Sequence, residues 1–286
     1  MTTVEMGVSA IWPDAAAVAE RLRQSVFAVR SPAGAGSATA WRADGLLVTN
    51  NHVAPGGQVQ VEAWDGSTYA ARVAVRDTIR DLALLTAQDV LVTPVSVRDA
   101  STIRVGELVL AVGNPWGRKG EVTIGIVAST GVAPAGGPRT PLRDAIYADV
   151  RLAPGNSGGP LADAAGRVMG INSMIVGGMA VAVPSSAVED LIAGRRAQRG
   201  VLGVAVLPVE VPVGPGLLLT EVIAGSGAAR AGLIPGDVVL AVNGVQGNLP
   251  AMGTELALLV PGDPVRIDLI RGGSPRSVQV VAGTAA

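Results

Sequence analysis

Short apolar runs alternate with turn-forming residues along most of this chain. From residue 26 onward, runs of four to eight mostly apolar residues, such as GLLVTN, LALLTA and MAVAVP, are separated by clusters of Gly, Pro, Asn and Asp. Short runs with frequent turn signals are typical of β barrels and sandwiches. The pattern therefore predicts a mainly β domain over residues 25–198.

Helices are predicted at both ends of this domain. Residues 14–24, within an N-terminal segment 1–24, carry the apolar residues Ala15, Val18 and Leu22 at helical spacing on one face. Residues 185–198 begin with two serines that can cap a helix, continue with acidic residues and end with arginines. That order of charges favours a helix dipole, so a second helix is expected there.

A different unit begins at Gly200. The apolar runs LLLTEVIA, DVVLAVNG, VRIDLIR and SVQVVA are interspersed with the helix-like stretches AARAGL and MGTELALLV. Strands mixed with short helices predict a small α+β domain over residues 200–286.

Composition narrows the classes of function. The 286 residues suffice for two domains, and no run reaches the roughly 18 apolar residues of a transmembrane segment. A net charge of −1 makes nucleic acid an unexpected partner. With no cysteine and one histidine, no disulfide, metal site or other cofactor is expected.

The N-terminal sequence MTTVEMGVSAIWPDAAAVAERLRQ lacks a basic start followed by an apolar core. Such a core marks a secretory signal, so none is identified. We therefore expect a cytoplasmic location. The alternative is export with a leader that is absent from this sequence.

The single histidine and one glycine-rich motif carry the candidate chemistry. His52 follows an apolar run in TNNHV, and Ser157 lies in GNSGGP. A serine hydroxyl is a weak nucleophile that needs an adjacent base, and imidazole has a suitable pKa. Glycines beside the serine allow a tight turn whose Gly155 and Ser157 N–H groups can bind an oxyanion. The motifs predict acyl transfer.

A carboxylate should orient the imidazole. Asp81 begins the apolar run DLALL, and a carboxylate beside a buried strand is costly unless it is paired. Asp77 is the competing candidate, but its polar neighbours suggest a solvated side chain. Asp149 is interpreted as structural.

The chain order His, Asp, Ser in TNNHV, DLALL and GNSGGP resembles that of chymotrypsin-like serine proteases. The segments GSATAWRADGLLVTNNHV, LVLAVGNPWG, VTIGIVAS and GRVMGINSM are similar to the HtrA (Deg) branch, and the resemblance covers nearly all of residues 25–195. It implies a double β-barrel with His52 as general base, Asp81 as orienting carboxylate and Ser157 as nucleophile. It also implies unfolded or damaged proteins as substrates.

The segment SGAARAGLIPGDVVLAVNG resembles a PDZ domain of the HtrA type. PDZ domains bind peptide C-termini by adding a strand to a sheet edge, and a loop captures the terminal carboxylate. The resemblance implies that Val201, Leu202, Gly203 and Val204 form this loop and the start of the groove. A PDZ domain that only packs against the protease is the alternative.

Arg151, six residues before Ser157, departs from the family, whose members usually carry a small or aliphatic residue there. The resemblance puts this position near the base of the S1 pocket, with Ser173, Met174 and Ile175 along S1 and the substrate-pairing strand. An inward Arg151 would favour an acidic P1 side chain, whereas an outward one would leave a small aliphatic preference.

Two further features stay open at this stage. The Gly- and Pro-rich segment 131–144 is expected to be a mobile loop near the site, and the family often uses such loops to switch between inactive and active forms. Trp12 and Phe27 are either core residues or, by resemblance, aromatic contacts of a homotrimer.

A serine endopeptidase is therefore the predicted function. The first alternative is a proteolytically inert or latent chain that binds peptides in the manner of a chaperone. The second is an esterase with the same residues, which a peptide-binding PDZ domain makes less favourable.

Overall fold

The computed structural model describes most of the chain, in the ranges 15–32, 34–131, 145–195, 198–257 and 259–284. Its contacts divide the chain into two compact units, unit 1 (residues 1–196) and unit 2 (residues 197–286). The predicted domain limits at 24, 198 and 200 stay predictions. Trp12 and residues 132–144 lie outside the described residues.

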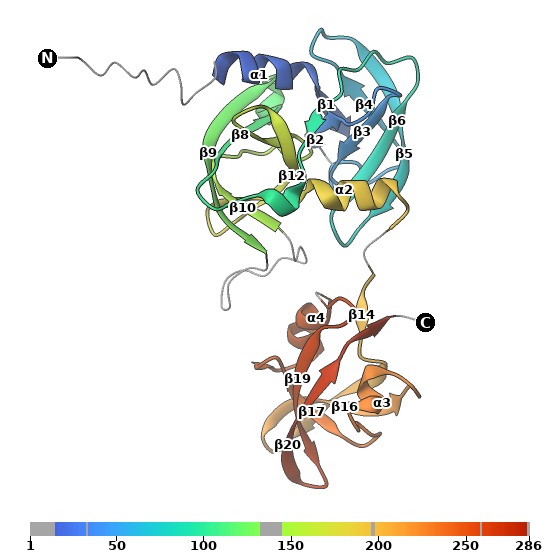
Figure 1. Ribbon diagram of the computed structural model, residues 1–286. Helices are drawn as coiled ribbons and strands as arrows, with labels where there is room; N and C mark the ends of the chain where they lie inside the picture. Colours follow the sequence, from blue (N-terminus) through green and yellow to red (C-terminus); the bar gives the residue numbers. More distant parts are fainter. Residues whose placement is uncertain (1–14, 33, 132–144, 196–197, 258, 285–286) are drawn as a thin grey trace, which may run out of the picture. The chain divides into compact units, whose positions relative to one another are not determined.

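Unit 1 begins with a closed six-stranded barrel (Figure 1). Around the barrel the strands are β1 (Val26–Ser31), β2 (Gly34–Ala40), β3 (Leu46–Thr49), β6 (Leu82–Ala87), β5 (Thr68–Asp77) and β4 (Gln58–Glu62). Aliphatic side chains fill its interior around Phe27, which is only 1% exposed. Phe27 is therefore a core residue, and its interpretation as a trimer contact is wrong.

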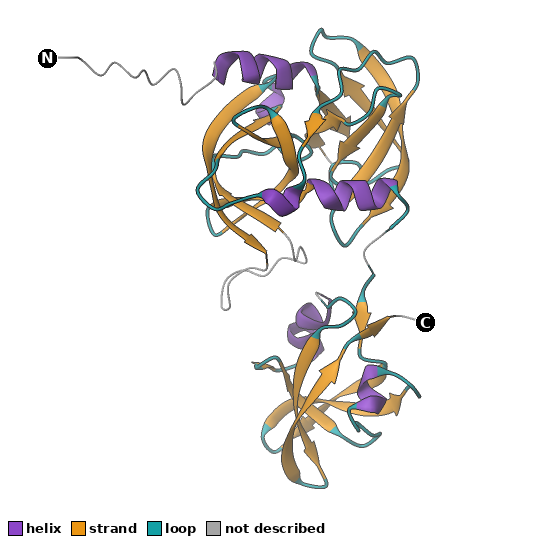
Figure 2. Cartoon of the chain, in the orientation of Figure 1, coloured by secondary structure: helices purple, strands orange, loops and turns teal. Residues whose placement is uncertain are grey.

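The second barrel of unit 1 is closed by a pairing of β11 with β12. Its strands are β11 (Pro160–Asp163), β8 (Leu108–Gly113), β9 (Glu121–Gly131), β10 (Ala145–Asp149), β13 (Met179–Pro184) and β12 (Arg167–Val176), and β7 (Ser96–Val97) extends the sheet beside β12. The 3₁₀ turns η2 (Ala100–Thr102) and η3 (Pro115–Gly117) lie in its connections. Two barrels of this kind confirm the predicted chymotrypsin-like fold class, and strands dominate the chain (Figure 2).

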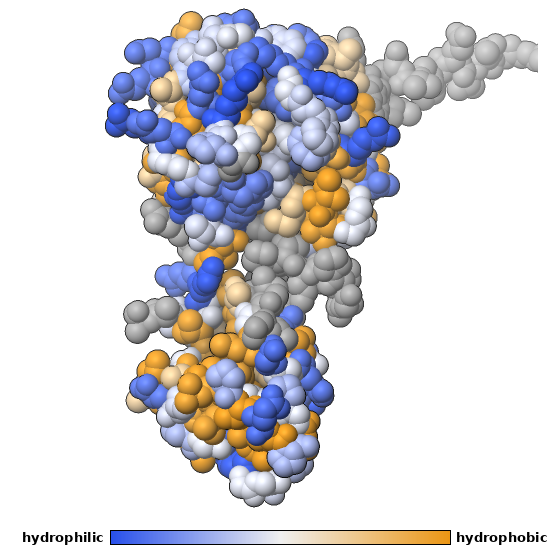
Figure 3. Space-filling view, turned by 180° about the vertical axis from the view of Figure 1, so that it is seen from behind, coloured by the Kyte–Doolittle hydropathy of each residue, from blue (hydrophilic) through white to orange (hydrophobic). Residues whose placement is uncertain are grey.

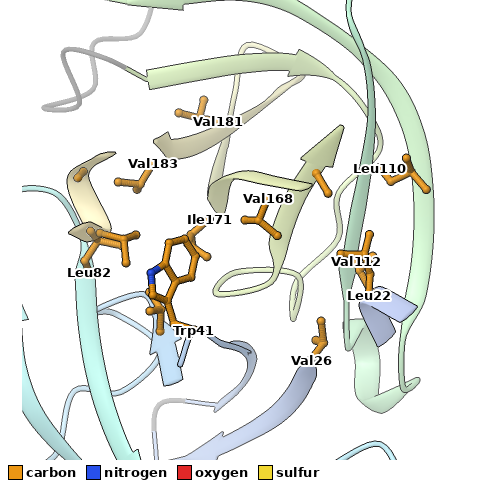
Figure 4. Close-up of a cluster of buried hydrophobic side chains, with 14 of the residues drawn as sticks. Leu22, Val26, Trp41, Leu82, Leu110, Val112, Val168, Ile171, Val181 and Val183 are labelled. Atoms are coloured by element: carbon orange, nitrogen blue, oxygen red, sulfur yellow. The ribbon is translucent and has the colours of Figure 1, made fainter. Parts of the chain in front are cut away.

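One hydrophobic cluster joins the two barrels and the helix α1 (Ala15–Gln24). Figure 4 shows Trp41 and Leu82 of the first barrel beside Ile171 of the second. Leu22 of α1 is buried in the same cluster, as its helical spacing predicted. The barrels therefore share a core, which fixes the residues at their junction.

Helix α2 (Ser185–Ile192) is shorter than the predicted helix 185–198. Gly194 adopts a φ of +78°. Its backbone N–H donates to the Leu191 carbonyl, and the Arg195 backbone N–H donates to the Asp190 carbonyl. These two bonds are the pattern of a Schellman helix end. Ser185 does not cap the helix, because its hydroxyl donates to the Arg98 carbonyl. The predicted serine cap is not formed, and the helix ends before the arginines that were expected at its end.

Unit 2 is a small α+β unit. Its main sheet has the order β15 (Val204–Val211), β16 (Gly214–Val222), β17 (Val238–Val242), β19 (Pro264–Arg271) and β20 (Ser274–Val281), with β18 (Val245–Gln246) beside β17. A second pairing joins β14 (Gly200–Val201) to β21 (Gly283–Thr284), and the helices are α3 (Gly227–Arg230) and α4 (Leu249–Ala257). Strand β15 is an edge of the main sheet.

One face of the main sheet of unit 2 packs on its core. Leu217, Val239 and Leu269 form a buried row across three strands. Figure 3 shows hydrophobic residues gathered on the surface of this unit. The large exposed ones are Leu207, Val213, Ile223, Ile234, Leu249 and Val281.

Candidate active site

The backbone turn formed by residues 153–159, here called the Ser157 turn, lies at the junction of the two barrels. Ser37 and Thr39 of β2 bond to it through the carbonyls of Gly155, Ser157 and Gly158. Gly158 has a φ of +88°, and a Cβ atom there would collide with the Ser37 carbonyl. The close approach of two barrels therefore requires this glycine.

Hydrogen bonds fix the carbonyls of the Ser157 turn. The carbonyl of Pro154 accepts from Trp116, and that of Asn156 accepts from the Gly159 N–H. Because C=O and N–H point in opposite directions in a trans peptide, these bonds aim the N–H groups of Gly155 and Ser157 the other way. Neither N–H has a hydrogen-bond partner among the residues that the structure describes. Two free N–H groups beside one serine can bind an oxyanion.

The Ser157 hydroxyl donates to the Ser173 carbonyl at 2.8 Å. Within the described ranges, no hydrogen bond joins it to His52. Both side chains nevertheless line one cavity of about 180 Å³. Catalytic hydrogen bonds are often long or poorly aligned without substrate and tighten only when substrate is bound.

Asp81 holds the imidazole of His52. Its Oδ2 lies 2.7 Å from Nδ1 of His52, and its Oδ1 accepts from the His52 backbone N–H at 3.0 Å. The Ser173 hydroxyl donates to the same Oδ2 at 2.7 Å. Since an ionised carboxylate only accepts, Nδ1 carries the proton and Nε2 is free to take another.

The sequence separates His52 from Asp81 by 29 residues, and the backbone brings them together. Asp81 adopts a left-handed φ of +53°, a conformation that aspartate tolerates better than most residues. Its carbonyl accepts from the Asn51 N–H at 3.1 Å and from Nδ2 of Asn50 at 2.9 Å. These two bonds tie the turn before β6 to the segment that carries His52.

The hydrogen bond to Asp81 raises the pKa of the His52 imidazole above its ordinary value. Partial burial lowers this pKa, and the negative charge of Asp81 raises it further. The imidazole is therefore a stronger base than a free histidine.

Asp77 does not have the solvated side chain that the sequence suggested. It is 2% exposed, and its Oδ1 accepts from the N–H groups of Ile79 and Arg80. Its carboxylate therefore shapes the turn that precedes Asp81. Asp149 is exposed at the end of β10.

Ser173 has a role that sequence reasoning missed. It is the extra residue of a β-bulge in β12, where Asn172 pairs with Ala182 and Met174 with Val181. The bulge lets one residue bond both Asp81 and Ser157. No local signal in the sequence marks a bulge here.

The other predicted substrate-binding residues are partly exposed. Ile175 is 52% exposed, and Met174 is half-buried. Arg151 is exposed, its carbonyl accepts from the Thr123 hydroxyl, and its guanidinium has no ion pair among the described residues.

The predicted groove residues of unit 2 run from the end of β14 to the start of β15. Val201 ends β14, Leu202 is buried, and Val204 begins the edge strand β15. The carbonyls of Leu202 and Gly203 accept from Ala228 and Ile223. The N–H groups that follow are at a free sheet edge, where an added strand can pair.

Two protein-family models match this chain. The model described as a trypsin-like peptidase domain matches residues 36–171, and the model described as a PDZ domain matches residues 218–250. The second match places a PDZ domain in unit 2, which suits peptide binding.

Curated relatives are serine endoproteases. A probable periplasmic serine endoprotease DegP-like of Rhizobium meliloti is 37% identical over 262 residues, which cover 84% of this chain and 51% of the relative. The periplasmic pH-dependent serine endoprotease DegQ of Escherichia coli is 32% identical over 261 residues, which cover 84% of this chain and 57% of the relative. The chain thus spans about half the length of the curated relatives it matches.

These relatives correct the expected location. They are named periplasmic proteins, which points to export, so the predicted cytoplasmic location is wrong. The prediction rested only on the lack of a recognisable secretory signal in residues 1–24. Within the described residues, no helix is long and apolar enough to cross a membrane.

A solved structure matches the chain over nearly its whole length. The HtrA-type protease AlgW with a tripeptide is 30% identical, with a TM-score of 0.63 over 96% of this chain and 98% of that one. The same protease with a decapeptide has the same TM-score. Together with the double barrel, the PDZ match and the serine endoprotease relatives, this similarity shows that the chain belongs to the HtrA (Deg) family of serine proteases.

Proposed function

We propose that this chain is a serine endopeptidase that cleaves peptide bonds through an acyl-enzyme. One observation carries the proposal. Within the described residues, the N–H groups of Gly155 and Ser157 have no hydrogen-bond partner, and Ser157 shares a cavity with His52, which Asp81 holds. No observation supports the inert peptide-binding alternative, and the PDZ domain disfavours the esterase.

The proposed reaction follows from this geometry. Nε2 of His52 takes the proton of the Ser157 hydroxyl as Oγ attacks the carbonyl carbon of the scissile bond. The N–H groups of Gly155 and Ser157 stabilise the oxyanion. The imidazolium, held by Asp81, then protonates the leaving amine. Water hydrolyses the acyl-enzyme with His52 again as base.

The substrates in this proposal are unfolded or damaged proteins, and unit 2 binds peptide C-termini. Support for the second part comes from the edge position of β15 and from the loop 201–204 at its start. The substrate class rests on the family alone. Assembly as a homotrimer also rests on the family alone. Size-exclusion chromatography with light scattering would measure the mass of the assembly and test it.

Labelling with a fluorophosphonate tests the proposal. The probe reacts with an activated serine, so the wild-type chain should be labelled and Ser157→Ala should not. A peptide with a free hydrophobic C-terminus should accelerate labelling, whereas its C-terminally amidated form should not. No labelling with either peptide would sink the protease proposal, and equal rates with both would sink the activating role of the PDZ domain.

The pH dependence of hydrolysis is predicted from the His52–Asp81 bond. His52 must be neutral to act as a base, so kcat/KM should rise with pH through the pKa of His52 in the free enzyme. Because the bond to Asp81 raises that pKa, the midpoint should lie above the ordinary value of about 6.5. A pH–rate profile at constant ionic strength measures it. A midpoint below that value contradicts the prediction.

Arg151 is proposed to favour acidic P1 side chains, since its exposed guanidinium has no ion pair in the described chain. Arg151→Ala should lower cleavage after Glu and Asp, relative to Val, by about tenfold or more, the value of a charge-assisted hydrogen bond. Cleavage-site mapping on a mixed peptide library measures the P1 preference of the wild type and of Arg151→Ala. A uniform Val, Ala and Ile preference in the wild type would refute this specificity.

A further inference from the structure

Ser37 is a fully buried serine of β2 that binds the Ser157 turn from the opposite barrel. Its hydroxyl donates to the Gly155 carbonyl at 2.7 Å and accepts from the Asn114 N–H at 2.9 Å. Its backbone N–H donates to the Ser157 carbonyl at 2.8 Å, and its carbonyl accepts from the Thr49 hydroxyl at 2.6 Å. One residue therefore holds the turn at two points.

The direction of the hydroxyl bond is fixed by its surroundings. The backbone N–H and the Nδ2 group of Asn114 both donate to Oγ of Ser37. A serine hydroxyl has one proton and two lone pairs, so the proton is left for the Gly155 carbonyl. Asn114 is itself held, because its Oδ1 accepts from the Gly120 N–H.

The hydrogen bond from the Ser37 hydroxyl acts on the peptide unit between Gly155 and Asn156. This unit lies between the peptide units that carry the N–H groups of Gly155 and Ser157, which have no hydrogen-bond partner in the described part of the chain. Gly155 has a φ of +109° and no Cβ, so its backbone has more conformations open to it than that of any other residue type. The Ser37 hydroxyl holds the carbonyl of this unit, and the Ala153 carbonyl holds its N–H. Rotation of the unit would displace both free N–H groups.

We propose that Ser37 is a positioning residue that holds the oxyanion hole in its open conformation, a role that rests on the acyl-transfer function proposed above. The oxyanion exists only in the transition state and the tetrahedral intermediate, so loss of the Ser37 hydroxyl lowers kcat and leaves KM unchanged. In the described residues, Ser37 bonds neither His52 nor Asp81.

Ser37→Ala tests the role against the matched variant Ser185→Ala. Ser185 is also a buried serine of unit 1 whose hydroxyl donates to a backbone carbonyl, that of Arg98. Removing a direct oxyanion donor costs about 10²- to 10³-fold in kcat, and we expect about 10- to 100-fold for Ser37→Ala because it acts indirectly. KM and the midpoint of the pH–rate profile should stay at the wild-type values. A peptide aldehyde inhibitor, which forms the tetrahedral adduct, should bind more weakly by the same factor as kcat/KM.

Three outcomes separate the possibilities. A kcat for Ser37→Ala equal to that of Ser185→Ala, in a chain that hydrolyses peptides through Ser157, overturns the positioning role alone. A wild type without Ser157-dependent hydrolysis overturns the proposed function and this role with it. If Ser37→Ala does not fold, Ser37→Cys keeps most of the volume with a weaker donor, and a wild-type kcat in that folded variant also overturns the role.

Discussion

Ser157→Ala is expected to lower kcat for peptide hydrolysis by about 10⁴- to 10⁶-fold and to leave the fold intact. The proposed acyl-enzyme forms on Oγ, and alanine removes only this atom. Among the described residues, the hydroxyl bonds the Ser173 carbonyl, so its loss should cost about 1 kcal/mol in the free energy of unfolding. Hydrolysis of a denatured, fluorophore-labelled substrate protein measures the loss of kcat. Thermal melting of the wild type and of Ser157→Ala measures the change in stability.

The control for this experiment is a serine remote from the site. Ser185→Ala also loses a hydroxyl hydrogen bond to a backbone carbonyl, so it should melt at a slightly lower temperature and keep its kcat. A Ser157→Ala protein that still hydrolyses the substrate at a hundredth of the wild-type rate would contradict the assignment of the nucleophile. Another group would then have to form the acyl-enzyme or activate water directly.

Local patterns carried most of the fold information in this sequence. The short apolar runs predicted a mainly β chain, and the spacing of Val18 and Leu22 predicted the buried face of α1. The same local reasoning extended α2 too far, because it counted serines and arginines and passed over Gly194. A glycine in the left-handed region ends a helix more decisively than a favourable charge order prolongs it.

The candidate site was predictable only where a motif carried it. His52, Asp81 and Ser157 stand in recognisable motifs, and the structure brings all three to the junction of the barrels. Ser37 and Ser173 lie in segments that resemble the family, GSATAWRADGLLVTNNHV and GRVMGINSM, but nothing in those segments signals the hydrogen bonds that the two residues make. Ser37 lies 118 residues from its partner Gly155, and Ser173 lies 92 residues from Asp81. Contacts of this kind depend on how two barrels meet, which no periodicity along the chain encodes.

Asp81→Asn is expected to lower kcat by about 10⁴-fold, which corresponds to about 5.5 kcal/mol in activation free energy. Oδ2 of Asp81 accepts from both His52 and Ser173, and Oδ1 accepts from the His52 backbone. An asparagine has one acceptor oxygen, so its NH₂ group must replace one of these oxygens. If NH₂ faces Nδ1, the imidazole proton moves to Nε2, which can then no longer take the Ser157 proton. Steady-state kinetics across pH measures the loss, and the midpoint of the residual activity should fall because the group that raises the pKa of His52 is gone.

Asp77→Asn is the matched control that separates an orienting carboxylate from a structural one. A single oxygen of Asp77 accepts from the N–H groups of Ile79 and Arg80, and an asparagine oxygen can keep both bonds. The Arg80 guanidinium lies a long 3.9 Å from this carboxylate, so the lost charge should lower stability modestly and leave kcat within about threefold of wild type. A large loss of kcat in Asp77→Asn together with a small one in Asp81→Asn would reverse the assignment. Asp77 would then orient His52 in solution, and the bonds between Asp81 and His52 would serve only to shape the turn.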